Sequence, residues 1–139
     1  MAHIESALYS ILTGDADVSG LVSTRVYPYV APQDVVLPFM TFSRISGEHA
    51  QHMGGGVGLA TVRLMVTSWA KKSDSASTLA EHVRDALQGY SGTAASVDVD
   101  AVILDGDSAD AEQLVAGKEQ FVYSVSQEYT FWFAESIPA

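Results

Sequence analysis

The stretch from residue 59 to residue 90 constrains the fold most, because a strand pattern changes there within a few residues into a helix pattern. In residues 59–69 two sets of side chains alternate, which predicts a strand with one face on a core. The inward set is Ala60, Val62, Leu64, Val66 and Ser68. Farther along, apolar side chains recur at steps of three and four, which predicts a helix lying on the sheet. These side chains are Ala76, Leu79, Ala80, Val83, Ala86, Leu87 and Tyr90. The chain therefore packs helix against sheet.

The ends of this helix, and a second helix at the N-terminus, also follow from the sequence. We expect Ser73 or Asp74 to cap the start of the first helix, and Gly89 to end it in a left-handed conformation. The N-terminal helix has one apolar stripe and ends at Gly14. Its stripe consists of Ile4, Ala7, Leu8, Ile11 and Leu12. Residues 15–23 predict a turn and one further helical turn, with Asp17 as a cap.

The remaining segments predict strands that differ in length and exposure. Pro28 and Pro32 confine residues 26–32 to a sheet edge or a crossover, and Pro38 opens a strand over residues 39–46. Residues 97–104 alternate as a half-buried strand, in which Val97, Val99, Ala101 and Ile103 share a face. The last strand is the longest, and one face carries Phe121, Tyr123, Val125, Tyr129, Phe131 and Phe133, interrupted only by Gln127.

Three segments are predicted to be irregular. Residues 47–58 are too long for a tight hairpin and rich in glycine, which predicts a flexible arm between two strands. Residues 105–117 predict an acidic turn, and residues 134–139 a tail. We therefore predict one α+β domain over residues 1–139, with a single mostly antiparallel or mixed sheet, two main helices on one face, and a long flexible β-hairpin loop.

Composition excludes several classes of protein. A chain of 139 residues buries about 68–70% of the surface of its unfolded form, enough for a core without cross-links. The chain has no cysteine, which excludes disulfides and thiolate chemistry and favours the cytosol. Its 7 Lys and Arg against 17 Asp and Glu give a net charge of −10, which disfavours nucleic-acid binding. We find neither a secretion leader nor a segment that spans a membrane.

The motifs that suggest chemistry each have a simpler interpretation. His49 and His52 follow Glu48 but lack the HExxH order, so a solvated loop is favoured over a metal site. Residues 54–58 are glycine-rich but precede a strand, whereas phosphate loops precede a helix. Residues 105–112 are acidic but lack the glycine and the last glutamate of a calcium loop. Residues 89–92 are one residue short of GxSxG. We predict a protein that is not an enzyme and needs no cofactor or metal.

Several apolar side chains have no place in a one-sided core. Met65 and Trp69 lie opposite the inward face of their strand, and Trp132 lies opposite that of the last strand. In residues 39–46, either Met40 and Phe42 or Phe39 and Ile45 are left over. Such a surplus indicates contact between copies of the chain. The predicted oligomer interface consists of Met40, Phe42, Arg63, Met65, Trp69 and Trp132.

The order of these motifs resembles the tail completion, or tail terminator, proteins of long-tailed bacteriophages. The resemblance rests on IESALYSILT, on RVYPYVAPQDVVLPFMTF, on the loop of histidines and glycines, and on VRLMVTSWAKKSDSASTLAEHVRDALQGY. It implies a structural neck protein that forms a hexameric ring in the virion, assembled in the host cytoplasm. The ring would end the tail tube and join it to the head connector. The acidic insertion at residues 105–112 is the least typical part.

The resemblance also implies partners and a path for DNA. The partners are other copies of the chain, the tail tube protein and the connector or stopper protein. DNA would pass through the ring without specific binding, because carboxylates facing a pore repel phosphates. The alternatives are a head-side connector adaptor and, in another class, a small metal- or ligand-binding domain. That last alternative predicts tight stoichiometric binding in a metal titration.

The arm is predicted to contact the tube or the connector through Glu48, His49, Gln51, His52, Met53, Gly54, Gly55 and Gly56. Deleting residues 51–57 should leave the fold intact, since a segment this rich in glycine is not expected to be held by its own packing, and should abolish head–tail joining. Circular dichroism and an in vitro joining assay measure the two effects. Normal joining by the deletion variant would contradict a role for the arm.

Overall fold

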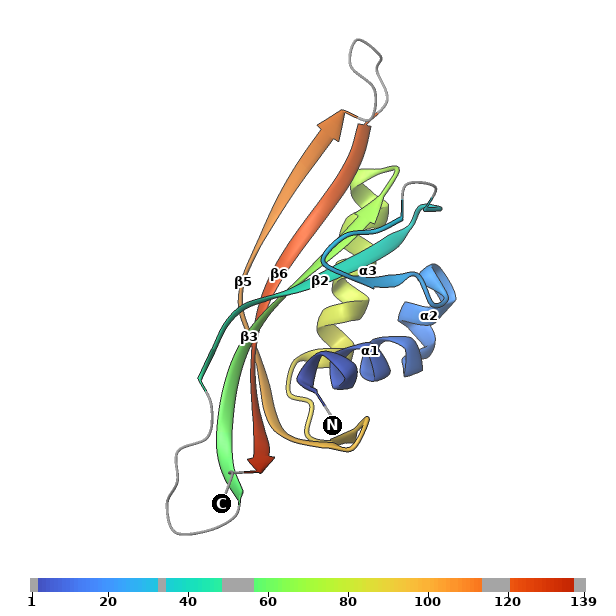
Figure 1. Cartoon of the computed structure of the whole chain (residues 1–139). Helices are drawn as coiled ribbons and strands as arrows, with labels where there is room; N and C mark the ends of the chain where they lie inside the picture. The colour runs from blue at the N-terminus through green and yellow to red at the C-terminus, as the bar shows by residue number, and fades with distance from the viewer. Residues whose placement is uncertain (1–2, 33–34, 49–56, 114–120, 137–139) are drawn as a thin grey trace.

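A computed structural model of the chain describes residues 3–32, 35–48, 57–113 and 121–136 (Figure 1). Three helices and six strands make up this part of the chain. In order they are α1 (Ile4–Gly14), α2 (Ala16–Val22), β1 (Val26–Pro28), β2 (Phe39–Glu48), β3 (Val57–Ala70), α3 (Ser73–Leu87), β4 (Gly92–Ala94), β5 (Val97–Gln113) and β6 (Phe121–Ser136).

The six strands form one mixed sheet in the order β1-β2-β3-β6-β5-β4. β1 is parallel to β2, and every other neighbouring pair is antiparallel. The sheet is long and curled, and the helices lie on one of its faces (Figure 1). The predicted α+β fold is therefore confirmed, and the proline-interrupted segment after residue 25 does form an edge strand.

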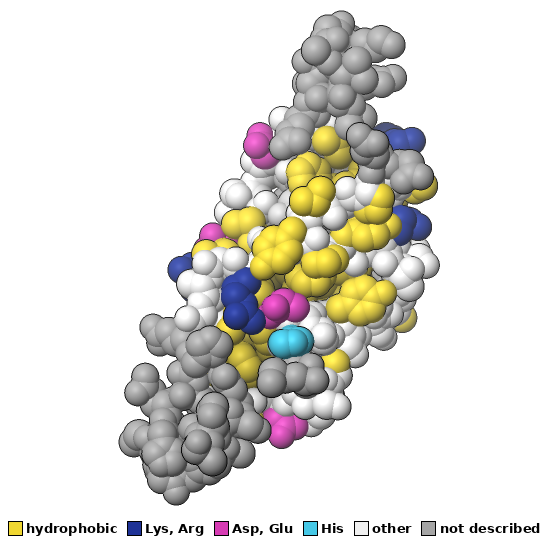
Figure 2. Space-filling view, viewed as in Figure 1, with side chains coloured by type: hydrophobic (Ala, Val, Ile, Leu, Met, Phe, Trp, Pro, Cys, Tyr) yellow, Lys and Arg dark blue, Asp and Glu magenta, His cyan; other side chains and the backbone are white. Residues whose placement is uncertain are grey.

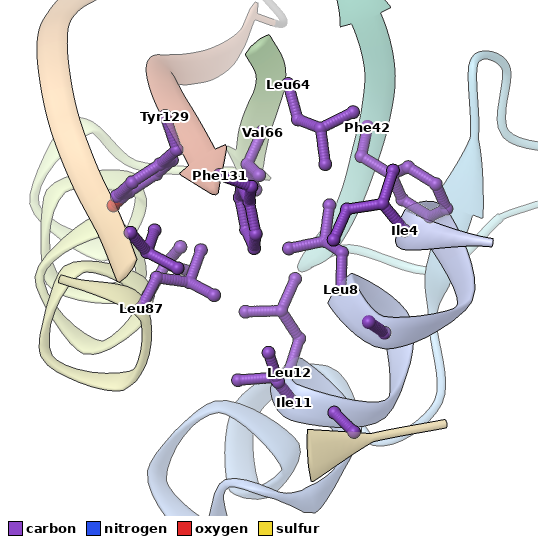
Figure 3. Packing of buried hydrophobic residues seen from close by; sticks show 14 of the residues in the cluster. Ile4, Leu8, Ile11, Leu12, Phe42, Leu64, Val66, Leu87, Tyr129 and Phe131 are labelled. Atoms are coloured by element: carbon purple, nitrogen blue, oxygen red, sulfur yellow. The ribbon is translucent and has the colours of Figure 1, made fainter. Parts of the chain in front are cut away.

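The core lies between the helices and the inner face of the sheet. Figure 3 shows Val66 and Phe131 pointing from the strands toward Leu8 and Leu12 of α1, with Leu87 of α3 beside them. All five side chains are fully buried. Each large apolar side chain that is removed from water contributes about 1.5–3 kcal/mol, so this layer holds the helices on the sheet. The predicted stripes of both main helices are the residues that lie in it or against it.

Two polar side chains of β6 are buried with this core. The Gln127 amide nitrogen donates a hydrogen bond of 3.2 Å to the backbone carbonyl of Ala80, which ties the middle of α3 to the sheet. The Gln127 side chain, which interrupts the apolar face of β6, therefore connects α3 to the sheet. Two residues away, burial raises the pKa of the Tyr129 hydroxyl well above its usual range, so this side chain is neutral in the folded protein.

The acidic segment differs most from its prediction, because residues 105–113 continue β5 as a strand. Their backbone pairs with β6 from Asp107 opposite Gln127 to Gln113 opposite Phe121. The pairing shifts register between Val99 and Ala101 and again between Leu104 and Gly106. Each extra residue reverses the faces that follow it. Val102 is therefore buried, whereas Ile103 is 48% exposed, and the predicted shared face of residues 97–103 is wrong.

Smaller differences concern the ends of the elements. The Asp15 carboxylate caps α2, by accepting from the N–H groups of Asp17 and Val18, in place of Asp17 itself. α3 begins after Lys72 without a side-chain cap, although Gly89 does adopt the expected left-handed conformation, with a φ of 78°. β6 continues to Ser136, so residues 134–136 belong to the sheet and only 137–139 lie outside the described residues.

The turn between β4 and β5 has an unusual sequence for its backbone. Ala95 and Ser96 have φ values of 48° and 67°, and they join the paired residues Ala94 and Val97. A two-residue hairpin with both φ values positive favours Asn-Gly, because other side chains are strained there. The double substitution Ala95→Asn and Ser96→Gly should therefore raise the free energy of unfolding, by about 1–2 kcal/mol.

Urea denaturation measures this change. Ser77→Gly is the control for the Ser-to-Gly exchange. It lies on the exposed face of α3, where glycine should lower the free energy of unfolding by about 0.5–1 kcal/mol. A turn variant less stable than the unchanged protein would contradict the strain.

Candidate subunit interface

The outer face of the sheet, opposite the helices, begins with a row of three aromatic rings. Phe39 of β2 stacks on Trp69 of β3, with ring centroids 5.8 Å apart and planes 13° apart. Tyr27 of β1 meets the edge of Phe39, at a centroid distance of 6.4 Å. The Trp69 indole N–H donates to the Thr41 hydroxyl over 3.1 Å. All three rings are half-buried, so the row holds neighbouring strands together and keeps one side open.

The middle of this face is a shallow hollow. It has a volume of about 240 Å³ and is lined by Met65, Gly106, Asp107, Ser108, Ser126 and Glu128. Beside it, the hydroxyls of Thr67 and Ser126 lie 3.1 Å apart and join β3 to β6. Met65 is half-buried, and the register places it on the outer face, opposite Ser43 and Glu128. The hollow is thus lined mostly by short or polar side chains, with Met65 as its one large apolar residue.

A charged network crosses the same face below the hollow. The Arg63 guanidinium contacts the Glu128 carboxylate at 2.7 Å and the Asp105 carboxylate at 3.8 Å. The Thr130 hydroxyl donates to the same Asp105 carboxylate. Because these charges are partly exposed, the ion pairs contribute about 0–1 kcal/mol each. The contacts instead hold Asp105 in place. Asp105 is the extra residue of the second bulge of β5, so the network fixes the direction of that bulge.

The structure places the predicted interface residues on different faces. Met40 and Phe42 are 0% and 5% exposed and point into the core, because their partners Ser68 and Val66 lie on the inner face of β3. Neither side chain is available to another copy. Phe39 and Ile45 occupy the outer face in their place, which is the other alternative that the alternation allows.

The other predicted interface residues keep an outward position. Met65 and Trp69 are half-buried on the outer face, and Arg63 is exposed within its charged network. Trp132 is half-buried near the opposite end, where its pairing partners are Thr61 and Ala101. Of the predicted arm, Glu48 ends β2, and residues 49–56 lie outside the described residues.

A second set of exposed apolar side chains lies in the segment that joins β1 to β2, and sequence reasoning missed it. Tyr29, Val30 and Val36 are 61%, 79% and 63% exposed. Figure 2 shows hydrophobic side chains gathered on the side where α1 and the β1 edge face the viewer. Tyr29 has a φ of 64°, and its N–H donates to the Phe42 carbonyl over 2.7 Å. The Tyr-Pro-Tyr-Val sequence carries the signal, but only the structure shows that these side chains remain uncovered.

A groove of about 570 Å³ separates this edge from α1. Its lining includes Tyr9, Pro28, Tyr29 and Phe42. At one end, the Arg44 guanidinium on β2 contacts the Glu5 carboxylate of α1 at 2.6 Å. The groove holds a single carboxylate, Glu5, and this ion pair already engages it. Its chemistry suits a protein surface better than a polar small molecule.

The motifs that suggested metal chemistry do not assemble a site in the described part of the chain. No group of three or more His, Cys, Asp or Glu side chains in it could hold a metal ion. The calcium-loop interpretation of residues 105–112 is excluded, because these residues form a strand and cannot wrap around a cation. His49 and His52 lie outside the described residues. Among the described helices, none has the length and apolarity needed to cross a membrane.

An α+β domain with a long curled sheet, an uncovered outer face and exposed apolar edges has the features of a subunit that assembles with other proteins. The chain belongs to the family of the tail completion protein gp17, whose profile matches residues 6–133. It is therefore a structural protein of the bacteriophage tail, and its place is the tail or neck of the virion.

Solved structures agree on the fold. A chain of the "Virion of native gene transfer agent (GTA) particle" superposes with a TM-score of 0.73 over 95% of each chain, at 18% sequence identity. At this identity the likeness shows a shared fold. No curated protein matches the sequence.

The aromatic row predicts that Trp69 stabilises the isolated chain. Trp69→Ala removes the stacking on Phe39 and the hydrogen bond to Thr41, so it should lower the free energy of unfolding by about 1–3 kcal/mol. Urea denaturation followed by circular dichroism measures the loss. Ile103→Ala, at an exposed position of β5, is the control and should change stability by less than about 0.5 kcal/mol. Equal effects would mean that the row does not hold the strands together.

Proposed function

We propose that this protein is the subunit of a ring that ends the tail tube and joins it to the head connector. The observation that carries the proposal is the pair of free strand edges on opposite sides of one sheet. β4 covers β5 only at Val97–Val99, and β1 covers β2 only at Met40–Phe42. Beyond these residues, no strand in the described part of the chain lies along either edge.

The two edges favour a ring over a symmetric dimer. They are different surfaces, one acidic and one apolar, so contact between them joins the front of one copy to the back of the next. Such head-to-tail contacts close into a ring when the rotation between copies divides a full turn. Six copies per ring, and a pore wide enough for duplex DNA, follow from the family resemblance.

The outer face supplies further contact area for the same assembly. Its open side chains include Phe39, Met65 and Trp69, together with the hollow beside Met65. Trp132, at the far end of the face, provides an aromatic anchor opposite Thr61, near the start of β3. Tryptophan and methionine are enriched where proteins meet, and aromatic anchors dominate binding energies.

The charge of the chain suits a conduit. With a net charge of −10, carboxylates that face the pore repel DNA phosphates within about 8 Å at physiological salt. DNA therefore passes without specific binding. A head-side connector adaptor shares this geometry and differs in the partner that it meets first, so the test includes both partners.

Solution mass and electron microscopy test the proposal together. Light scattering of the free protein should give six chains of 14.8 kDa, about 89 kDa, if rings form unaided, and 14.8 kDa if they form only on tail tubes. Negative-stain images should show annular density at tube ends. Particles that stay monomeric, with bare tube ends, would contradict the ring. Density on isolated connectors but not on tubes would favour the head-side adaptor.

A further inference from the structure

We propose that one copy docks on the next by placing the acidic edge of β5 against a basic corner at the opposite edge of the sheet. The acidic edge is residues 105–111, with Asp105, Asp107 and Asp110 as its exposed charges, of which Asp105 contacts Arg63. The basic corner is formed by Arg25, Lys71 and Lys72. This inference rests on the proposed ring and names the contact that builds it.

The backbone of the acidic edge is paired on one side only in the described part of the chain. Residues 105–111 are exposed, and in the described part of the chain only β6 pairs with them. Their side chains, in the order Asp, Gly, Asp, Ser, Ala, Asp and Ala, have low strand propensity. The segment is the outermost strand of the sheet here, and its unpaired N–H and C=O groups can pair with the backbone of a further neighbour. The small side chains let that neighbour approach the backbone closely.

The basic corner lies where β3 passes into α3. Lys71 and Lys72 line a groove of about 490 Å³, whose apolar side chains include Leu21, Leu37 and Pro38. The Arg25 guanidinium donates to the carbonyls of Pro38 and Leu21, over 3.0 and 3.1 Å, and is therefore held at the same corner. Asp74 is the one acidic residue that lines the groove. No carboxylate of the described residues pairs with these three cations.

The strand register places Asp110 at one end of a row and Phe39, which follows Pro38 of the basic groove, at the other. Asp110 lies opposite Ser124, Ser124 opposite Trp69, and Trp69 opposite Phe39. Lys71 follows Trp69 by two residues, and Pro38 directly precedes Phe39. A neighbour related by a rotation in the plane of this row therefore brings its acidic edge to the basic corner at the same height.

Charge complementarity selects this contact over others. Two copies of a protein with net charge −10 repel each other in most orientations. The basic corner is where a carboxylate of another copy is attracted. Opposite charges at close range orient the encounter and penalise wrong pairings, and salt weakens the effect.

Charge reversal tests the contact. Asp107→Lys with Asp110→Lys makes both surfaces basic, and Lys71→Glu with Lys72→Glu makes both acidic. Each double variant alone should associate at least about tenfold more weakly than the unchanged protein, because like charges then meet. Combining all four substitutions in one chain, or mixing the two double variants, should restore rings. Analytical ultracentrifugation and negative stain, with and without tail tubes, measure the association.

A matched control separates the contact from net charge. Glu81→Lys with Asp85→Lys makes the same charge change on the exposed face of α3 and should leave ring formation unchanged. Circular dichroism verifies that every variant is folded.

The outcomes distinguish this inference from the proposed function. Rings formed equally well by the Asp107 and Asp110 double variant would overturn the acidic-edge contact and leave the ring standing. Weak association of both double variants without rescue in the mixture would also overturn it. Absence of rings for the unchanged protein, free and on tubes, would overturn the proposed function itself.

Discussion

The antiparallel pairing of β3 with β6 is the contact on which the rest of the structure depends. All 14 residues of β3 have a partner in β6, from Val57 opposite Ser136 to Ala70 opposite Tyr123. This long ribbon fixes which side chains face inward, so it determines where α1 and α3 can pack. It also sets the rows on the outer face, because β2 and β5 attach to its two sides. The core and the candidate interface are thus opposite faces of one ladder.

Much of the fold could be predicted from sequence because regular periods dominate it. The inward residues of β3 and the stripes of α1 and α3 all lie where alternation and steps of three and four place them. β5 could not be predicted in the same way. Its extra residues, Asp100 and Asp105, are visible only against a partner strand, and its acidic half has turn composition. Pairing with β6 overrides that local preference.

The candidate interface was harder to predict than the fold, for a physical reason. Alternation divides β2 into two sets, but it does not say which set faces the helices, and Met40 and Phe42 are as apolar as Phe39 and Ile45. Pairing with Ser68 and Val66 decides the matter, and it places Phe39 beside Trp69. The exposure of Tyr29 and Val30 depends on a left-handed residue after β1, which no period reveals. Sequence periods therefore do not determine which apolar side chains of β2 and of the following loops remain exposed.

The carboxylates along β5 have a further consequence for the protein before assembly. A naked strand border invites pairing with an identical border, which would give dead-end dimers or fibrils. Asp107 and Asp110 oppose this outcome, because two such borders bring like charges together. In the proposed ring, this repulsion favours contact between the two different edges of the sheet over contact between two identical edges. Under the proposed assembly, these aspartates therefore act against aggregation of free chains as well as in the contact between copies.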